Sequence, residues 1–155
     1  MAQELSTDPY VPATGSLPAA ATREQALAWV HRQQGRHAEG RGFSFTIVLA
    51  DTAVPVGHCG LWLKDLPQGR GTAGYSIIPS ARGQGLATDA LGALTAFAWT
   101  VPGLHTVELA IEPWNTASVR VAERAGYQYR ELLPRHQEID GRRRDVLVFT
   151  ATRPA

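Results

Sequence analysis

Short segments in which apolar and polar residues alternate recur along the chain, and this period of two is typical of half-buried strands. In the segment 43–49, Phe, Phe, Ile and Leu alternate with Ser, Thr and Val. The dipeptide Asp140-Gly141 lies between two apolar segments and predicts a hairpin turn. The pattern predicts strands at 43–49, 56–63, 73–78, 105–111 and 127–133, and hairpin arms at 136–139 and 146–150.

Three longer segments carry apolar residues at helical spacing. Thr22 and Gln25 match a capping box, which predicts a helix that begins after Thr22 and ends before Gly40. A second helix is expected at about 84–100, because Pro-Gly follows it, and a third at about 116–125, because a glycine follows it.

The order of these elements predicts one mixed α/β domain over residues 22–155. A helix separates the strands at 73–78 and 105–111, so these two strands must run parallel. The other strands are expected to be mostly antiparallel. Residues 1–21 contain three prolines among small residues and are predicted to be a mostly irregular N-terminal segment.

Composition narrows the class of protein. The net charge of +1 gives no reason to expect nucleic acid or an anionic membrane as a partner. No apolar segment approaches the roughly 20 residues that a membrane helix needs, and the N-terminus lacks a secretory signal pattern. The single cysteine, Cys59, cannot form an internal disulfide, which fits a cytoplasmic protein.

Between the strand at 73–78 and the helix that follows lies a glycine-rich loop, Arg82-Gly83-Gln84-Gly85-Leu86-Ala87. The first turn of a helix carries N–H groups without partners inside the helix, and its dipole adds positive potential there. Glycines let an anion approach the backbone closely. The loop therefore predicts a phosphate-binding site, although it matches neither the P-loop nor the dinucleotide-binding motif.

A second motif, Asn115-Thr-Ala-Ser118, follows the strand at 105–111 and begins the next helix. In an open α/β sheet, ligands bind beyond the C-terminal ends of parallel strands, so both motifs are expected at one cleft. Together, GYSIIPSARGQGLATDAL and NTASVRVAERAGY resemble the Rim-type branch of the GNAT acetyltransferase superfamily. That branch includes N-terminal acetyltransferases of ribosomal proteins and relatives that act on small amines.

The resemblance implies a GNAT fold with a splayed parallel strand pair, and acetyl-CoA as co-substrate without a metal. It implies that Ile77 and Ile78 offer backbone groups to the pantetheine arm, and that Asn115 contacts the same arm. It also implies that Ser118 protonates the leaving thiolate, and that the CoA pyrophosphate lies on residues Arg82, Gly83, Gln84, Gly85, Leu86, Ala87 and Thr88.

The chain departs from the family pattern in two places. Many family members have a tyrosine as general acid seven residues after the asparagine, where this chain has Ala122. Most also begin with a further strand and a complete first helix, and in this chain that region is expected to be either shortened or diverged. An absent edge strand would expose its neighbour, which favours a homodimer.

The expected reaction is direct transfer of an acetyl group from acetyl-CoA to a primary amine, either a peptide N-terminus or a small molecule. A backbone N–H of the strand at 73–78 is expected to hold the oxyanion. The base must reach the amine directly or through water, and His58, Glu108 and Glu112 are the candidates. The alternative from another class is a non-catalytic acyl-CoA-binding module.

Overall fold

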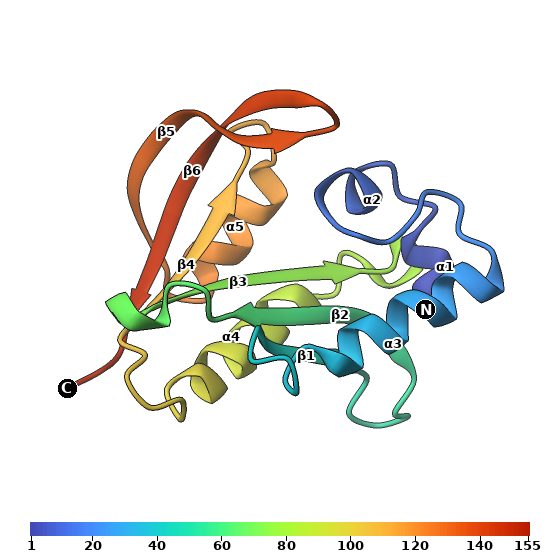
Figure 1. Cartoon of the computed structure of the whole chain (residues 1–155), viewed down its shortest axis with the longest axis horizontal. Helices are drawn as coiled ribbons and strands as arrows, with labels where there is room; N and C mark the ends of the chain where they lie inside the picture. Colours follow the sequence, from blue (N-terminus) through green and yellow to red (C-terminus); the bar gives the residue numbers. More distant parts are fainter.

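One mixed sheet of six strands organises the chain, and the computed structural model describes all residues 1–155. The order across the sheet is β1-β2-β3-β4-β6-β5 (Figure 1). The strands are β1 (Gly42–Val48), β2 (Pro55–Trp62), β3 (Arg70–Ile77), β4 (Thr106–Ile111), β5 (Gln128–Ile139) and β6 (Arg142–Thr152).

The sheet contains one parallel pair, as the sequence predicts. β3 and β4 run parallel and pair only from Arg70–Thr72 to Thr106–Glu108, whereas every other neighbouring pair is antiparallel. Beyond Thr72 the two strands separate (Figure 1). The predicted mixed α/β fold with a splayed parallel pair is therefore confirmed.

Five α-helices and two short 3₁₀ helices surround the sheet. The predicted capping box is present at α3, because the Thr22 hydroxyl accepts from the Gln25 N–H and the Gln25 side chain accepts from the Thr22 N–H. The helices are α1 (Ala2–Leu5), α2 (Tyr10–Thr14), α3 (Arg23–Gly35), η1 (Leu66–Gln68), η2 (Pro79–Ala81), α4 (Leu86–Ala98) and α5 (Thr116–Arg124).

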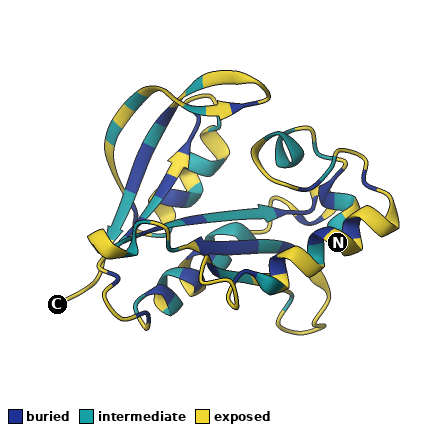
Figure 2. Ribbon diagram, in the orientation of Figure 1, coloured by how far each residue is buried: buried dark blue, intermediate teal, exposed yellow.

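Two hydrophobic clusters hold these layers together, and Figure 2 shows the buried residues concentrated in the central strands. The larger cluster joins β2, β3, β4 and β6 to α4 and α5, with Leu61, Leu91 and Val107 almost fully buried. The second cluster joins α1 and α3 to the start of β2 and the end of β3. Helix α3 therefore covers one side of β2 and β3, and α4 covers the other (Figure 1).

The N-terminal segment differs from the prediction of irregular structure. Residues 1–21 contain α1 and α2, and Leu5 and Leu17 of this segment are 0% and 3% exposed in the second cluster. Asp8 initiates α2, because its carboxylate accepts from the N–H groups of Tyr10 and Val11. Tertiary packing and the hydrogen bonds to Asp8 thus form helices where the prolines alone favour a loop.

The C-terminal hairpin also differs from the prediction. The segments 127–133 and 136–139 belong to one long strand, β5, which pairs with β6 on both sides of an irregularity between Leu133 and Gln137. Pro134 cannot donate to the ladder and Arg135 has φ of 49°, so the strand bulges instead of ending.

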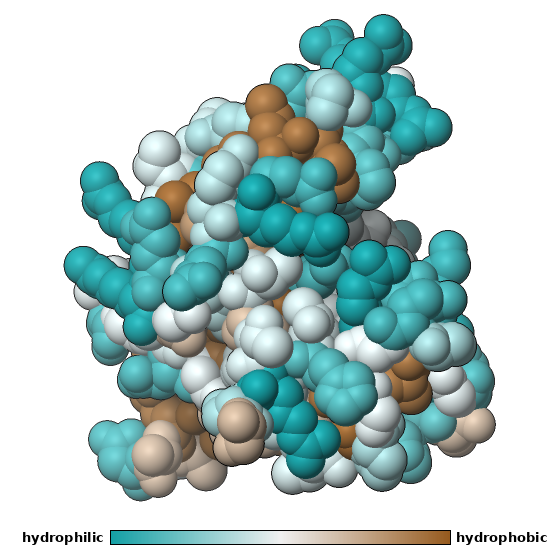
Figure 3. All heavy atoms as spheres, turned by 90° about the vertical axis from the view of Figure 1, so that its left-hand side faces the viewer, coloured by the Kyte–Doolittle hydropathy of each residue, from teal (hydrophilic) through white to brown (hydrophobic).

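The surface of the molecule is mixed in polarity. On the face seen in Figure 3, apolar side chains form separate patches among hydrophilic ones. Each helix of the chain is too short or too polar to span a membrane. β1 lies at one edge of the sheet, and the homodimer expected from an exposed edge stays a prediction.

Candidate active site

A cleft of about 670 Å³ lies where β3 and β4 separate. Its walls come from α2 and α3, from Thr72–Ser76 of β3, from the end of β4 and from the start of α5. Residues 73–76 of β3 have no pairing partner on the β4 side. The cleft therefore contains a free strand edge.

The glycine-rich loop leads into α4 at the end of β3. Gly83 and Gly85 have φ of 78° and 79°, the left-handed region that glycine adopts without strain. Gly85 is the N-cap of α4, and no side chain caps this helix. Residues 82–85 are exposed, so the first amides of α4 are open to an anion.

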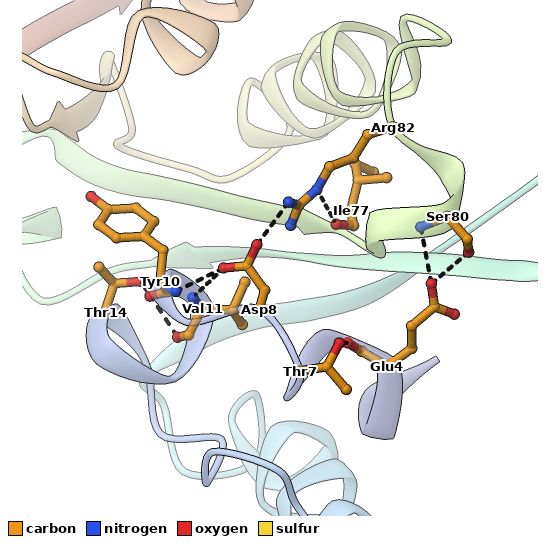
Figure 4. Close-up of polar contacts among 9 residues, drawn as sticks. All are labelled: Glu4, Thr7, Asp8, Tyr10, Val11, Thr14, Ile77, Ser80 and Arg82. Atoms are coloured by element: carbon orange, nitrogen blue, oxygen red, sulfur yellow. Dashed lines mark hydrogen bonds and ion pairs between the residues drawn. The ribbon is translucent and has the colours of Figure 1, made fainter.

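The Arg82 side chain braces this loop. Its Nε donates to the Ile77 carbonyl at 3.0 Å, and its Nη1 lies 2.7 Å from Oδ2 of Asp8 (Figure 4). A second link joins the same regions, because the Glu4 carboxylate accepts from the Ser80 N–H at 3.0 Å (Figure 4). Arg82 thus ties β3, the loop and α2 together.

The side chains of Ile77 and Ile78 are buried, and much of their backbone is already bonded. The Ile78 N–H donates to Val56 and its carbonyl accepts from Ala81, while the Ile77 carbonyl accepts from Arg82. On the β4 side, β3 has no strand partner from residue 73 to its end at Ile77. A pantetheine arm can add along this edge, and the backbone role expected of Ile77 and Ile78 stays a prediction.

Asn115 and Ser118 lie at the start of α5, where both line the cleft. The Asn115 side-chain oxygen accepts from the Ser118 N–H at 3.1 Å, so this asparagine caps the helix. Ala122, where many family members have a tyrosine, is 0% exposed in the core. The chain therefore presents no hydroxyl at position 122.

A tyrosine that the sequence reasoning missed lies on β3 across from Ser118. The Tyr75 hydroxyl is buried and has no hydrogen-bond partner, although it lies close to Ser118. Burial raises the pKa of Tyr75, and the nearby Ser118 offsets part of the rise. An unpartnered buried hydroxyl at a cleft is a group that a ligand can satisfy.

Glu112 is the buried carboxylate of the cleft, and it is only 4% exposed. Its Oε1 lies 3.8 Å from Nε of Arg144. This nitrogen atom is buried and has no hydrogen-bond partner. The hydroxyl of Tyr10, a residue of α2, lies beside Glu112 and Asn115. Its pKa is raised mainly by burial and further by the Glu112 carboxylate. Arg144 of β6 therefore reaches the carboxylate from the hairpin, while its own side chain stays partly exposed.

His58 of β2 lines the same cleft from the α3 side. Its Nε2 lies 2.7 Å from the Ser44 hydroxyl, and its ring packs edge-on against Trp29 at 5.0 Å. Burial, assisted by the Arg36 charge, lowers the pKa of His58 to about 4. The third candidate base, Glu108, pairs with Arg130 at 3.0 Å and does not line the cleft.

The splayed strands, the open helix start and the cleft are together typical of an acetyltransferase fold, and the chain belongs to the GNAT acetyltransferase family. A family model described as an acetyltransferase (GNAT) domain matches residues 1–128. The predicted superfamily is therefore confirmed.

Among individual relatives, an uncharacterized N-acetyltransferase p20 of Bacillus licheniformis is 30% identical over 112 residues. The match covers 72% of this chain and 63% of p20, so the chain spans less than two thirds of that relative's length.

Two solved structures are similar to the whole fold. RimJ of Mycobacterium smegmatis in complex with CoA-disulfide is 28% identical with a TM-score of 0.72, and the match covers 82% of this chain and 62% of RimJ. The ribosomal-protein acetyltransferase RimL in complex with coenzyme A has a TM-score of 0.81 at 17% identity, with 97% of this chain and 84% of RimL covered.

Proposed function

We propose that this chain is an acetyl-CoA-dependent N-acetyltransferase that transfers an acetyl group to a primary amine within a ternary complex. The observation that carries the proposal is the cleft where β3 and β4 separate, beside the open N-terminus of α4. The similarity to RimJ, which was solved with CoA-disulfide, supports the choice of co-substrate.

The residues at the start of α4 fit a diphosphate. A Cβ placed on Gly83 or Gly85 would meet no atom within 4 Å, so the loop presents bare backbone to solvent. The unpaired amides of the first turn and the helix dipole both favour an anion there. Acetyl-CoA supplies the activated thioester, and the free edge at residues 73–76 supports placing its pantetheine arm in the splay.

Glu112 is our choice as base, acting directly or through a water molecule. It is the acidic side chain of the cleft, and its burial excludes the bulk solvent that would weaken its interaction with an ammonium group. The amine gives its proton to this carboxylate and attacks the thioester carbonyl carbon. The new C–N bond forms as the C–S bond breaks, and the thiolate leaves.

Ser118 and Tyr75 are our choice for the groups that stabilise and protonate the thiolate. Both line the cleft from opposite sides of the splay, one on α5 and one on β3. The raised pKa of Tyr75 keeps its hydroxyl protonated at neutral pH, so that it remains a hydrogen-bond donor. Two hydroxyl donors would take the place of the tyrosine that is absent at position 122.

Release of free thiol from acetyl-CoA, measured against a panel of primary amines, tests the proposal. The panel should contain peptides with free N-termini, amino acids and polyamines. We expect thiol release that depends on at least one amine, with acetylated product found by mass spectrometry. Tight CoA binding without turnover on any amine would favour the non-catalytic acyl-CoA-binding module instead.

Two glycine-to-alanine variants, one in the loop and one in the helix that follows, test whether the loop binds the diphosphate. Gly85→Ala should let the free loop relax out of the left-handed conformation, so that CoA must restore it at a cost of about 1–2 kcal/mol, which weakens CoA binding about tenfold. Gly92→Ala lies on the exposed side of α4, meets nothing within 4 Å and should leave CoA affinity unchanged. Equal CoA affinity in both variants, measured by calorimetry, would contradict a diphosphate site at the loop.

A further inference from the structure

The wall of the cleft on the α3 side is built on two glycines. Gly60 of β2 and Gly74 of β3 are partners in the register of these strands. A Cβ at Gly60 would lie 2.4 Å from Nη1 of Arg36, and a Cβ at Gly74 would lie 3.0 Å from Cζ3 of Trp62. The bare backbone of these two residues therefore forms a floor against which the arginine and the tryptophan pack.

Arg36 carries a buried charge without a counter-ion. It is 8% exposed, its Nη1 donates to the Phe43 carbonyl at 3.2 Å, and its Nη2 donates to the side-chain oxygen of Gln33. Its guanidinium carbon lies 4.4 Å from the Trp62 ring centre. None of these partners is an anion, and a buried cation without one is costly in free energy.

The nearby charges on this wall are also positive. Arg32 and Arg41 line the cleft together with Arg36, and the one carboxylate of the cleft, Glu112, follows β4 and lies near Arg144. Arg32 uses one N–H for the Ser16 carbonyl at 3.2 Å, and Arg41 pairs with Glu39. The cleft is therefore positive on its α3 side, and Arg36 lacks a negative partner there.

We propose that the surface formed by Arg32, Arg36 and Trp62, here called the arginine wall, binds an oxyanion of the acceptor. The inference rests on the proposed function and names its substrate class: a primary amine that also carries a carboxylate or a phosphate. A guanidinium group presents several donors in one plane, which suits both kinds of oxyanion. The same wall repels polyamines, which offer only positive charge.

The first arm of the test measures anion binding without any reaction. Acetate and inorganic phosphate are titrated separately into the full chain while the Trp62 indole and His58 imidazole resonances are followed by NMR. We expect saturable shifts with at least one anion, and the tighter of the two identifies the preferred group. No saturable shift with either anion would overturn the arginine wall.

Variants of Arg36 and Arg23 test whether the anion binds at the arginine wall. Arg36→Gln should weaken anion binding at least tenfold, about the loss of one charged contact. Arg36→Lys, which keeps the charge but not the fork, should weaken it less and checks that the fold survives. Arg23→Gln removes an exposed arginine from the same helix outside the cleft and should leave binding unchanged. Equal losses in Arg36→Gln and Arg23→Gln would contradict a specific site.

The second arm compares amines with and without an anionic group: phosphoethanolamine with ethanolamine, and β-alanine with β-alaninamide, a pair of nearly equal size. We expect kcat/KM to be at least tenfold higher for the anionic member of a pair, and Arg36→Gln to abolish that preference. Acetylation of both members at equal rates would overturn the inference and leave the acetyltransferase standing. Anion binding at Arg36 without transfer to any amine would overturn the proposed function and leave the anion site standing.

Discussion

Two hydroxyl groups, those of Ser118 and Tyr75, lie near each other at the splay, and we expect both to lower the barrier to thiolate departure. Ser118→Ala and Tyr75→Phe should each reduce kcat by about 10- to 100-fold, because a proton donor for the leaving group is lost, with little change in KM. Steady-state thiol release measures both constants.

Tyr127→Phe is the matched control for these variants. Its hydroxyl is also in the core, where it lies 2.7 Å from the Thr95 hydroxyl, but it does not line the cleft. Its loss should reduce stability and leave kcat unchanged. Wild-type turnover in both Ser118→Ala and Tyr75→Phe would remove these residues from the mechanism.

The pKa of His58 makes stability depend on pH. The pKa is about 4 in the folded chain, against 6.5 for an exposed histidine, because burial and then Arg36 disfavour the charged ring. Above pH 6.5 neither state binds a proton at this site. As the pH falls from there, only the unfolded state becomes protonated, so about 3 kcal/mol of the free energy of unfolding should be lost by pH 4.

His58→Gln should make this loss of stability smaller, as measured by urea unfolding at pH 7, 5.5 and 4. An identical decline in the wild type and the variant would show that His58 titrates normally. The same variant also tests the choice of base. If Glu112 is the base, the pH–rate curve should survive in His58→Gln, whereas Glu112→Gln should lower kcat and flatten that curve.

At the scale of elements, the pair Asp8–Arg82 connects α2 to the loop before α4. Burial would raise the pKa of Asp8, but Arg82 and the N–H groups of Val11 and Tyr10 outweigh it and lower that pKa. The stabilisation is therefore present above the carboxyl's unfolded pKa and is lost as the pH falls through the lower folded value.

A double-mutant cycle of Asp8→Asn and Arg82→Gln should give a coupling of about 0.5–1 kcal/mol at pH 7, because Arg82 is half exposed and solvent screens the pair. The coupling should vanish at a pH where Asp8 is protonated. Asp51→Asn, in an exposed turn, is the control. A coupling of zero at pH 7 would mean that the pair does not join the two elements.

Local signals decided which elements could be predicted. The capping box at Thr22, the turn at Asp140-Gly141 and the strand–glycine–helix order around Gly85 each act over a few residues, so the sequence was enough. Helices α1 and α2 could not be predicted, because they are too short to form alone and depend on tertiary contacts such as the burial of Leu5.

At the scale of the whole molecule, the residues of the candidate site also divide into those that the sequence could predict and those that depend on tertiary contacts. The loop before α4 and the Asn115–Ser118 turn are contiguous motifs and could be found from the sequence. Arg36 and Tyr75 could not, because the roles proposed for them depend on neighbours far along the chain: the glycine floor for Arg36 and α5 for Tyr75. The one available signal was the alternation of β3, which places Tyr75 and Ala73 on one face.

The separation of the two faces of β2 and β3 has an evolutionary consequence. Cys59, Leu61 and Ala73 pack in the larger cluster with α4, whereas His58 contacts Trp29 of α3 and Trp62 contacts Arg36 at the end of that helix. Substitutions confined to the cleft-lining side chains on the α3 side can therefore leave the loop before α4 untouched. A lineage built on this chain could change which molecules it modifies while the proposed source of acyl groups stays fixed, and its sequence should drift faster at those cleft-lining positions than at the loop.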